Sequence, residues 1–235
     1  GGPDGFGYTF KNSSHASGPS YNWFDISVIG TQVTGLSDDN FVGPFPMSGF
    51  PYYTNNPTQF WIGSNGFISF VPMNIASTAA SFPAIPAVGG PNNFIAPFLS
   101  DLTLNGGTNP GRVYRYDAGD TICVSFVDVP FWVNNANQFG GSNSFQIILN
   151  RADSSITYNY LKQTGAPDPV YVNNYISIGI ENSTGNEGLQ YYRGASIPSI
   201  INTAVKFSYP AVVQPITDAA VHWVDNDRSA GKFVP

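Results

Sequence analysis

Charged side chains are scarce in this chain. Lys and Arg number 9 and Asp and Glu 15 among 235 residues, so 10% of residues are charged and the formal net charge is −6. An average soluble domain carries roughly a quarter of charged residues. A protein that binds nucleic acid needs a basic face to neutralise phosphates, and this composition does not supply one. We therefore exclude nucleic acid as a partner.

Cysteine is also scarce, and long apolar runs are missing. Cys123 is the single cysteine, which excludes an internal disulfide framework and a cysteine-rich metal site. Its neighbours Ile122 and Val124 predict a buried structural thiol. Pro, Gly and Asn interrupt every uncharged stretch before it reaches the ~20 apolar residues of a membrane helix. We expect no membrane insertion by this chain.

Glycine, proline and aromatic residues are abundant, and the apolar residues alternate with polar ones. The chain has 25 Gly, 19 Pro and 15% aromatic residues, which favours turns over helices. Alternation with period two predicts strands. Turn residues between alternating runs, such as Asn65-Gly66, Asp117 with Gly119, and Asp153-Ser154, predict hairpins. The expected hairpins join residues 59–62 with 67–71, 112–116 with 121–129, and 144–150 with 156–160.

These features predict an all-β fold, an antiparallel, jelly-roll-like β-sandwich with long loops. At most one short helix is expected, at residues 76–81, because several prolines follow. We divide the chain into an N-terminal leader strand region packed on the sandwich (1–37), the sandwich itself (38–209), and a C-terminal strand or linker (210–235). The last segment is expected to lead to a following domain or a neighbouring subunit, within a longer product. Its Trp223 needs a surface to bury it.

Five phrases of the sequence, in order, resemble one known family. Residues 62–70 (IGSNGFISF) are similar to the "SSNGFLTF" strand of nidogen-like extracellular domains in secreted bacterial surface proteins, particularly of the Bacteroidota type. The other phrases lie at residues 43–53, 94–102 (FIAPFLSDL), 143–149 (NSFQIIL) and 177–191. Leu99 and Ser100 depart from the family's "IAPFWDDL" pattern. The resemblance implies an extracellular β-sandwich module at the cell surface, without a known catalytic role.

Residues suited to catalysis are few. His15 and His222 form no metal-ligand motif, and no nucleophile elbow is present. The two glutamates, Glu181 and Glu187, flank what reads as a hairpin loop, so we interpret them as solvated turn residues rather than a glycosidase pair. We expect that the chain is not an enzyme.

Aspartates in loops suggest a cation site. Ca²⁺ takes six to eight oxygen ligands from carboxylates, amides and carbonyls. The adjacent Asp38 and Asp39 repel each other unless a cation lies between them, which makes them the first candidates. Asp101 is the third metal candidate, and Asp225 with Asp227 forms a weaker one. Turn formation and capping are the alternative role of each group.

Aromatic side chains near turns suggest contacts with a partner. We select Trp132, Tyr52, Tyr53 and Trp223 as candidates, because amphipathic rings favour stacking on sugars or burial in an interface. The expected function is adhesion, or assembly of a cell-surface or filamentous structure, through strand edges and aromatic loops. The expected partners are proteins or identical subunits at the cell surface. The alternatives are a carbohydrate-binding module and an accessory domain of a secreted hydrolase or peptidase, with glycans as ligands.

Overall fold

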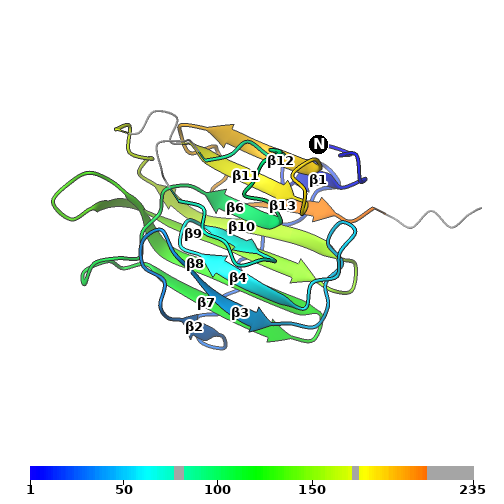
Figure 1. Ribbon diagram of the computed structural model, residues 1–235, viewed down its shortest axis with the longest axis horizontal. Helices are drawn as coiled ribbons and strands as arrows, with labels where there is room; N and C mark the ends of the chain where they lie inside the picture. Colours follow the sequence, from blue (N-terminus) through cyan, green and yellow to red (C-terminus); the bar gives the residue numbers. More distant parts are fainter. Residues whose placement is uncertain (77–81, 171–174, 211–235) are drawn as a thin grey trace, which may run out of the picture.

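The computed structural model describes residues 1–76, 82–170 and 175–210. In this part of the chain all regular structure is β, arranged as two antiparallel sheets packed face to face (Figure 1). The predicted antiparallel β-sandwich is therefore confirmed. The expected short helix falls on residues 76–81, and 77–81 lie outside the described residues. No described helix is long and apolar enough to span a membrane.

One sheet has seven strands, and all its neighbours are antiparallel. In spatial order they are β1 (Thr9–Asn12), β13 (Thr203–Ser208), β10 (Ser155–Thr164), β9 (Phe139–Asn150), β8 (Thr121–Trp132), β7 (Arg112–Ala118) and β2 (Thr31–Val33).

The second sheet has six strands and faces the viewer in Figure 1. In spatial order they are β12 (Gly188–Gly194), β11 (Ile176–Glu181), β6 (Phe94–Leu99), β5 (Phe67–Ser69), β4 (Gln59–Gly63) and β3 (Phe41–Pro46).

The predicted hairpins form as expected. The pairs β4–β5, β7–β8 and β9–β10 are antiparallel neighbours joined by short turns. In β9–β10 the register sets Phe145 opposite Tyr160 and Ile147 opposite Tyr158. The apolar sets of both strands therefore fall on one face, as period-two alternation requires.

The first strand belongs to this sandwich. β1 pairs with β13 from Thr9 opposite Ser208 to Asn12 opposite Val205, and so forms one edge of the seven-stranded sheet. Residues 13–30 then cross the outer face of that sheet to reach β2 at the other edge. Phe24 of this segment lies over β9, because its backbone amide donates a 3.1 Å hydrogen bond to the side chain of Gln146 in that strand. The polar face of β9 is therefore covered by the chain itself.

Tyrosines tie the two sheets together across the core. The Tyr158 hydroxyl group donates a 2.7 Å hydrogen bond to the carbonyl oxygen of Gly179 in β11. The Tyr160 hydroxyl donates at the same distance to the carbonyl of Pro97 in β6. The β11–β6 ladder shifts register between Ser177 and Gly179, so it does not use every carbonyl there. Buried carbonyls need partners, and the tyrosines supply them.

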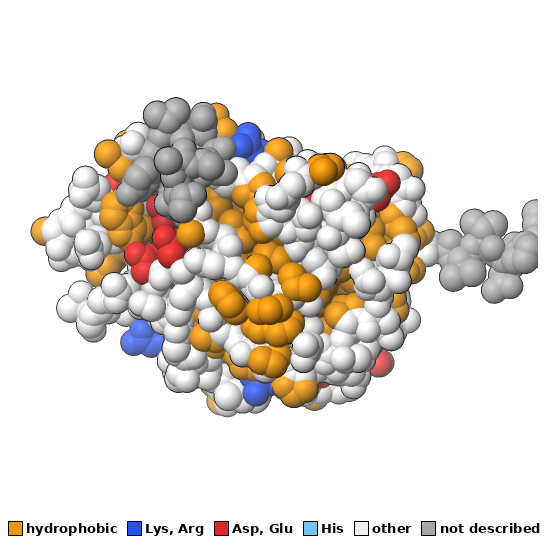
Figure 2. Space-filling view, viewed as in Figure 1, with side chains coloured by type: hydrophobic (Ala, Val, Ile, Leu, Met, Phe, Trp, Pro, Cys, Tyr) orange, Lys and Arg blue, Asp and Glu red, His pale blue; other side chains and the backbone are white. Residues whose placement is uncertain are grey.

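The outer face of the six-stranded sheet carries a second apolar cluster. Phe67, Phe94, Ala96 and Leu99 point away from the main core and pack with side chains of the long β5–β6 connection. Figure 2 shows apolar side chains gathered across the middle of this face. The β5–β6 connection thus covers part of an outer sheet face that would otherwise be exposed to water.

Candidate functional site

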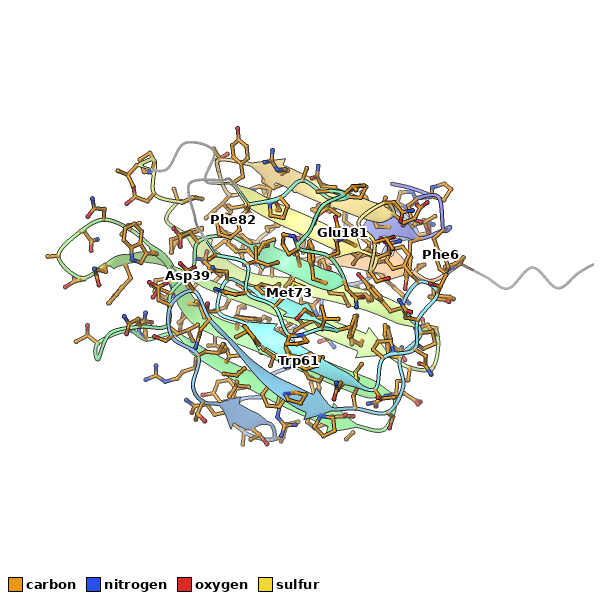
Figure 3. The ribbon with its side chains drawn as sticks, in the orientation of Figure 1. Phe6, Asp39, Trp61, Met73, Phe82 and Glu181 are labelled. Atoms are coloured by element: carbon orange, nitrogen blue, oxygen red, sulfur yellow. The ribbon has the colours of Figure 1, made fainter. Side chains whose placement is uncertain are left out.

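Three carboxylates predicted as metal ligands converge at one end of the sandwich. Asp38 and Asp39 lie in the connection between β2 and β3, and Asp101 follows β6. One oxygen from each lies within 4.8 Å of the others. Figure 3 places Asp39 at the end of the molecule opposite Phe6, and Figure 2 shows acidic side chains grouped there. We call these three residues the acidic cluster.

The buried side chain of Asn65 holds the cluster in place. Its Nδ2 donates to Oδ1 of Asp39 at 2.8 Å and to the carbonyl of Ile75 at 2.7 Å. Its Oδ1 accepts a 2.9 Å hydrogen bond from the amide of Leu102, the residue after Asp101. One turn residue of the β4–β5 hairpin therefore fixes both segments that carry the carboxylates.

The ionised form of the Asp38 carboxyl group is disfavoured by its surroundings. It lies half-buried beside Thr103, with which it forms an isolated β-bridge, and its Oδ1 is buried with no hydrogen-bond partner. Burial, and then the neighbouring charge of Asp39, raise the pKa of the Asp38 carboxyl group above its usual value. The repulsion between two ionised carboxylates at this separation is on the order of 3 kcal/mol at an effective dielectric constant of about 20.

The donor set fits a hard cation. Three carboxylates at this separation match the oxygen ligands and flexible geometry that Ca²⁺ accepts, and the orphaned Oδ1 of Asp38 is an atom that a cation would satisfy. Asp38, Asp39 and Asp101 would hold the ion, which would cancel their repulsion. Ca²⁺ binding stays a prediction.

Trp132 lies beside the acidic cluster. Its backbone amide donates a 2.9 Å hydrogen bond to the carbonyl of Asp101. It ends β8 opposite Phe139 of β9, and its side chain is half-buried. The structure thus brings this predicted contact residue to the same end of the sandwich as the metal candidates.

Tyr52 and Tyr53 were wrongly chosen as partner-contact residues. Their side chains are 0% and 2% exposed. The Tyr52 hydroxyl lies 2.6 Å from the carbonyl oxygen of Phe94, and the Tyr53 ring packs against Phe6 with centroids 5.2 Å apart. The connection containing them folds into the core instead of out to solvent, because Tyr52 finds a partner on β6 and Tyr53 finds one in the N-terminal segment.

The remaining sequence predictions concern the C-terminal candidates, Glu181 and Asn65. Trp223, Asp225 and Asp227 lie outside the described residues. Glu181 is not a solvated turn residue, because it is fully buried at the end of β11. Asn65 was interpreted only as a hairpin turn residue. Its Asn-Gly signal located the turn but gave no sign that the side chain reaches two other segments.

These features define the chain as a two-sheet antiparallel β-sandwich with an acidic cluster in the loops at one end. The family model described as NIDO related matches residues 7–224. The chain belongs to this nidogen-related family. No curated protein and no solved structure matches the chain.

Proposed function

We propose that this chain is a non-catalytic module of a secreted bacterial surface protein, of the Bacteroidota type, and that it acts in adhesion or assembly outside the cell. Membership of the nidogen-related family supports the proposal, as does the low charge of the chain. Proteins and identical subunits are the partners that the proposal assigns.

The observation that carries the proposal is an uncovered apolar turn at a sheet edge. β2 pairs with β7 on one side and is the last strand of the seven-stranded sheet. The turn that leads into it exposes Val28 and Ile29, which are 87% and 58% exposed. An edge strand offers unpaired backbone groups to an incoming strand, and adjacent apolar side chains add area that a partner buries.

The test is self-association. Analytical ultracentrifugation over a concentration series should show association of the wild-type chain. The double variant Val28→Asp/Ile29→Asp should remain monomeric. The matched control is Val88→Asp, because Val88 is 81% exposed in another connection. A wild-type chain that stays monomeric throughout, or a Val88 variant that dissociates equally, would contradict assembly through this edge.

We propose Ca²⁺ as the cofactor of the acidic cluster. Its role is structural, because the ion would join the β2–β3 connection to the segment after β6. These are the segments that Asn65 already links.

A second candidate function is glycan binding. It is favoured by the half-buried Trp132, whose backbone amide is hydrogen-bonded to the Asp101 carbonyl, since an aromatic ring near the acidic cluster suits stacking on a sugar. Binding on a glycan array that Trp132→Ala abolishes and that chelator weakens would favour this function. Absence of binding by the wild-type chain would leave assembly as the only candidate.

A further inference from the structure

The polar face of β11 is covered by part of the β5–β6 connection. We call residues 82–87 the strap. Alternation along β11 sends Ile178 and Ile180 into the main core and Ser177, Gly179 and Glu181 to the opposite face. The strap lies on that opposite face. Figure 3 labels Phe82 and Glu181, which lie near each other over the upper part of the molecule in this view.

Side chains of β11 and β12 hold the strap backbone. The Ser177 hydroxyl donates to the carbonyl of Pro83 at 2.7 Å. The Arg193 guanidinium donates to the carbonyl of Phe82 at 3.1 Å, and the amide of Ile85 donates to Oε1 of Gln190 at 3.1 Å. The strap is therefore hydrogen-bonded along its length by polar residues of two strands.

Apolar contacts complete the docking. Phe82 and Ile85 are 2% and 5% exposed and belong to the cluster on the outer sheet face. A Cβ atom at Gly179 would lie 3.0 Å from Cδ1 of Ile85, and one at Gly188 would lie 3.1 Å from its Cγ2. The glycines of β11 and β12 thus let the strap approach the sheet closely.

Glu181 is the one carboxyl group among these anchors. Its Oε2 accepts a 2.7 Å hydrogen bond from the amide of Ala87. Its Oε1 is buried and has no hydrogen-bond partner, and the residue is fully buried. A buried carboxylate with one unsatisfied oxygen is costly, whereas the neutral acid is tolerated. Burial accordingly raises the pKa of Glu181 to about 7.

We propose that Glu181 is a pH-sensitive latch: its neutral carboxyl group keeps the strap docked on β11 and β12, and its ionisation loosens the strap. Loosening is the response that relieves the cost, because it lets water reach Oε1. The outer apolar cluster around Phe94 and Leu99 is then exposed more often above neutral pH than below it.

The other titratable or charged groups on the elements around Glu181 make contacts away from its carboxyl group. Tyr52, on the β3–β4 connection, contacts the Glu181 backbone, and its hydroxyl accepts a 2.9 Å hydrogen bond from the Glu181 amide. Asp4, of the N-terminal segment, accepts from the Tyr53 hydroxyl at 3.0 Å. Glu187, in the turn between β11 and β12, lies against Gly5. Arg193, on β12, sits over the Tyr175 ring at 4.3 Å.

The experiment measures hydrogen exchange of the strap against pH. Peptides containing residues 82–87 are followed by mass spectrometry in the wild-type chain and in Glu181→Gln, and the ratio of the two rates at each pH cancels intrinsic exchange. The ratio should rise roughly 30-fold between pH 5.5 and 8.5, given a folded pKa of about 7 and an ordinary value of 4.5 in the loosened state. Glu187→Gln, the same change at the only other glutamate, should behave as the wild type.

Two results would overturn the latch. One is a ratio that does not change with pH, and the other is an equal rise in peptides from β8 and β9, which would make the effect global.

If Glu181→Gln does not fold, an NMR titration of the wild-type chain tests the proposal without the variant. Labelling glutamate with ¹³C at the carboxyl group yields two resonances, since the chain has two glutamates. The Glu181 signal and the Ala87 amide shift should share a midpoint near pH 7, and a midpoint near the ordinary value would refute the proposal.

Discussion

The hydroxyl group of Tyr160 in β10 donates a 2.7 Å hydrogen bond to the carbonyl oxygen of Pro97 in β6, across the full depth of the core. Both sheets are thereby joined at a point where the ladder of the six-stranded sheet is irregular. Burial raises the pKa of Tyr160 well above its usual value, which favours the protonated phenol that donates this bond. Packing alone does not specify the offset of two sheets as sharply as such a bond does.

Removing this hydroxyl group should destabilise the sandwich. Tyr160→Phe leaves the ring in place but leaves the Pro97 carbonyl without its donor, at a cost of about 1–3 kcal/mol in unfolding free energy. Urea denaturation with a fixed m-value is the measurement. Tyr192→Phe is the control, since that hydroxyl donates to the Ser196 carbonyl in an exposed position and should cost under ~0.5 kcal/mol. Equal losses in the two variants would contradict the cross-sheet role.

Ca²⁺ should raise the melting temperature. A ligand that binds only the folded state stabilises by about 2.7 kcal/mol at 100-fold excess over Kd, which corresponds to ~5–10 °C for a chain of this size. Asp39→Asn should lose most of this rise. Asp120→Asn, in the β7–β8 turn, should retain it. Melting curves that are the same in Ca²⁺ and in chelator would remove the site.

The acidic cluster also predicts a pH dependence in chelator. Because the pKa of Asp38 is raised above its ordinary value of 3.8, the folded state holds its proton to higher pH than the unfolded state does. Its contribution to stability therefore falls as pH rises above about 4, until the carboxyl is ionised in both states. The urea midpoint of the wild type minus that of Asp38→Asn should therefore become smaller, or more negative, from pH 4 to pH 6. A difference that grows over this interval has the wrong sign for the argument.

Cys123 should be unreactive in the folded protein. It is fully buried in β8, and burial raises the pKa of its thiol to about 12, so little thiolate exists at pH 8. Ellman's reagent should label it only after guanidinium is added, at one thiol per chain. Cys123 lies on the same face of the sheet as Ser125 and Gln146, so rapid labelling of the native protein would show that the segment covering this outer face opens readily.

Asn65 should be more important than a turn residue normally is. Asn65→Ala removes three hydrogen bonds and leaves the buried Leu102 amide without an acceptor, so we expect a loss of about 2–4 kcal/mol in unfolding free energy and weaker Ca²⁺ binding. Asn186→Ala, in the exposed β11–β12 turn, is the control. Calorimetric titration and urea denaturation of both variants check the prediction. Unchanged Ca²⁺ affinity in Asn65→Ala would separate the cluster from its support.

The acidic cluster was only partly within reach of the sequence. The repulsion between the adjacent Asp38 and Asp39 made them the first metal candidates, whereas nothing in the sequence showed that Asp101, the third candidate, lies next to them. Its approach to the pair depends on how the β2–β3 connection meets the end of β6, and that contact joins segments distant in the chain. Tyr52 and Tyr53 failed as contact residues for the same reason, since nothing local shows whether a loop ring turns toward solvent or toward the core.

The sequence by itself determined the hairpins β4–β5, β7–β8 and β9–β10, because alternation with period two and turn residues such as Asn65-Gly66 act over a few residues. Alternation along β11 likewise places Ile178 and Ile180 on one face and Ser177 and Glu181 on the other. Only the tertiary structure decided what lies over the opposite face. Ser177 and Glu181 read as solvent-facing, and Gln146 of β9 sits on the polar side of its strand, yet all three are buried because the strap and residues 13–30 cross those faces. The alternation along a strand shows which face carries its apolar residues. It does not show whether a segment distant in the sequence covers the other face. Where such a segment does, its hydrogen bonds satisfy the polar side chains and allow them to be buried.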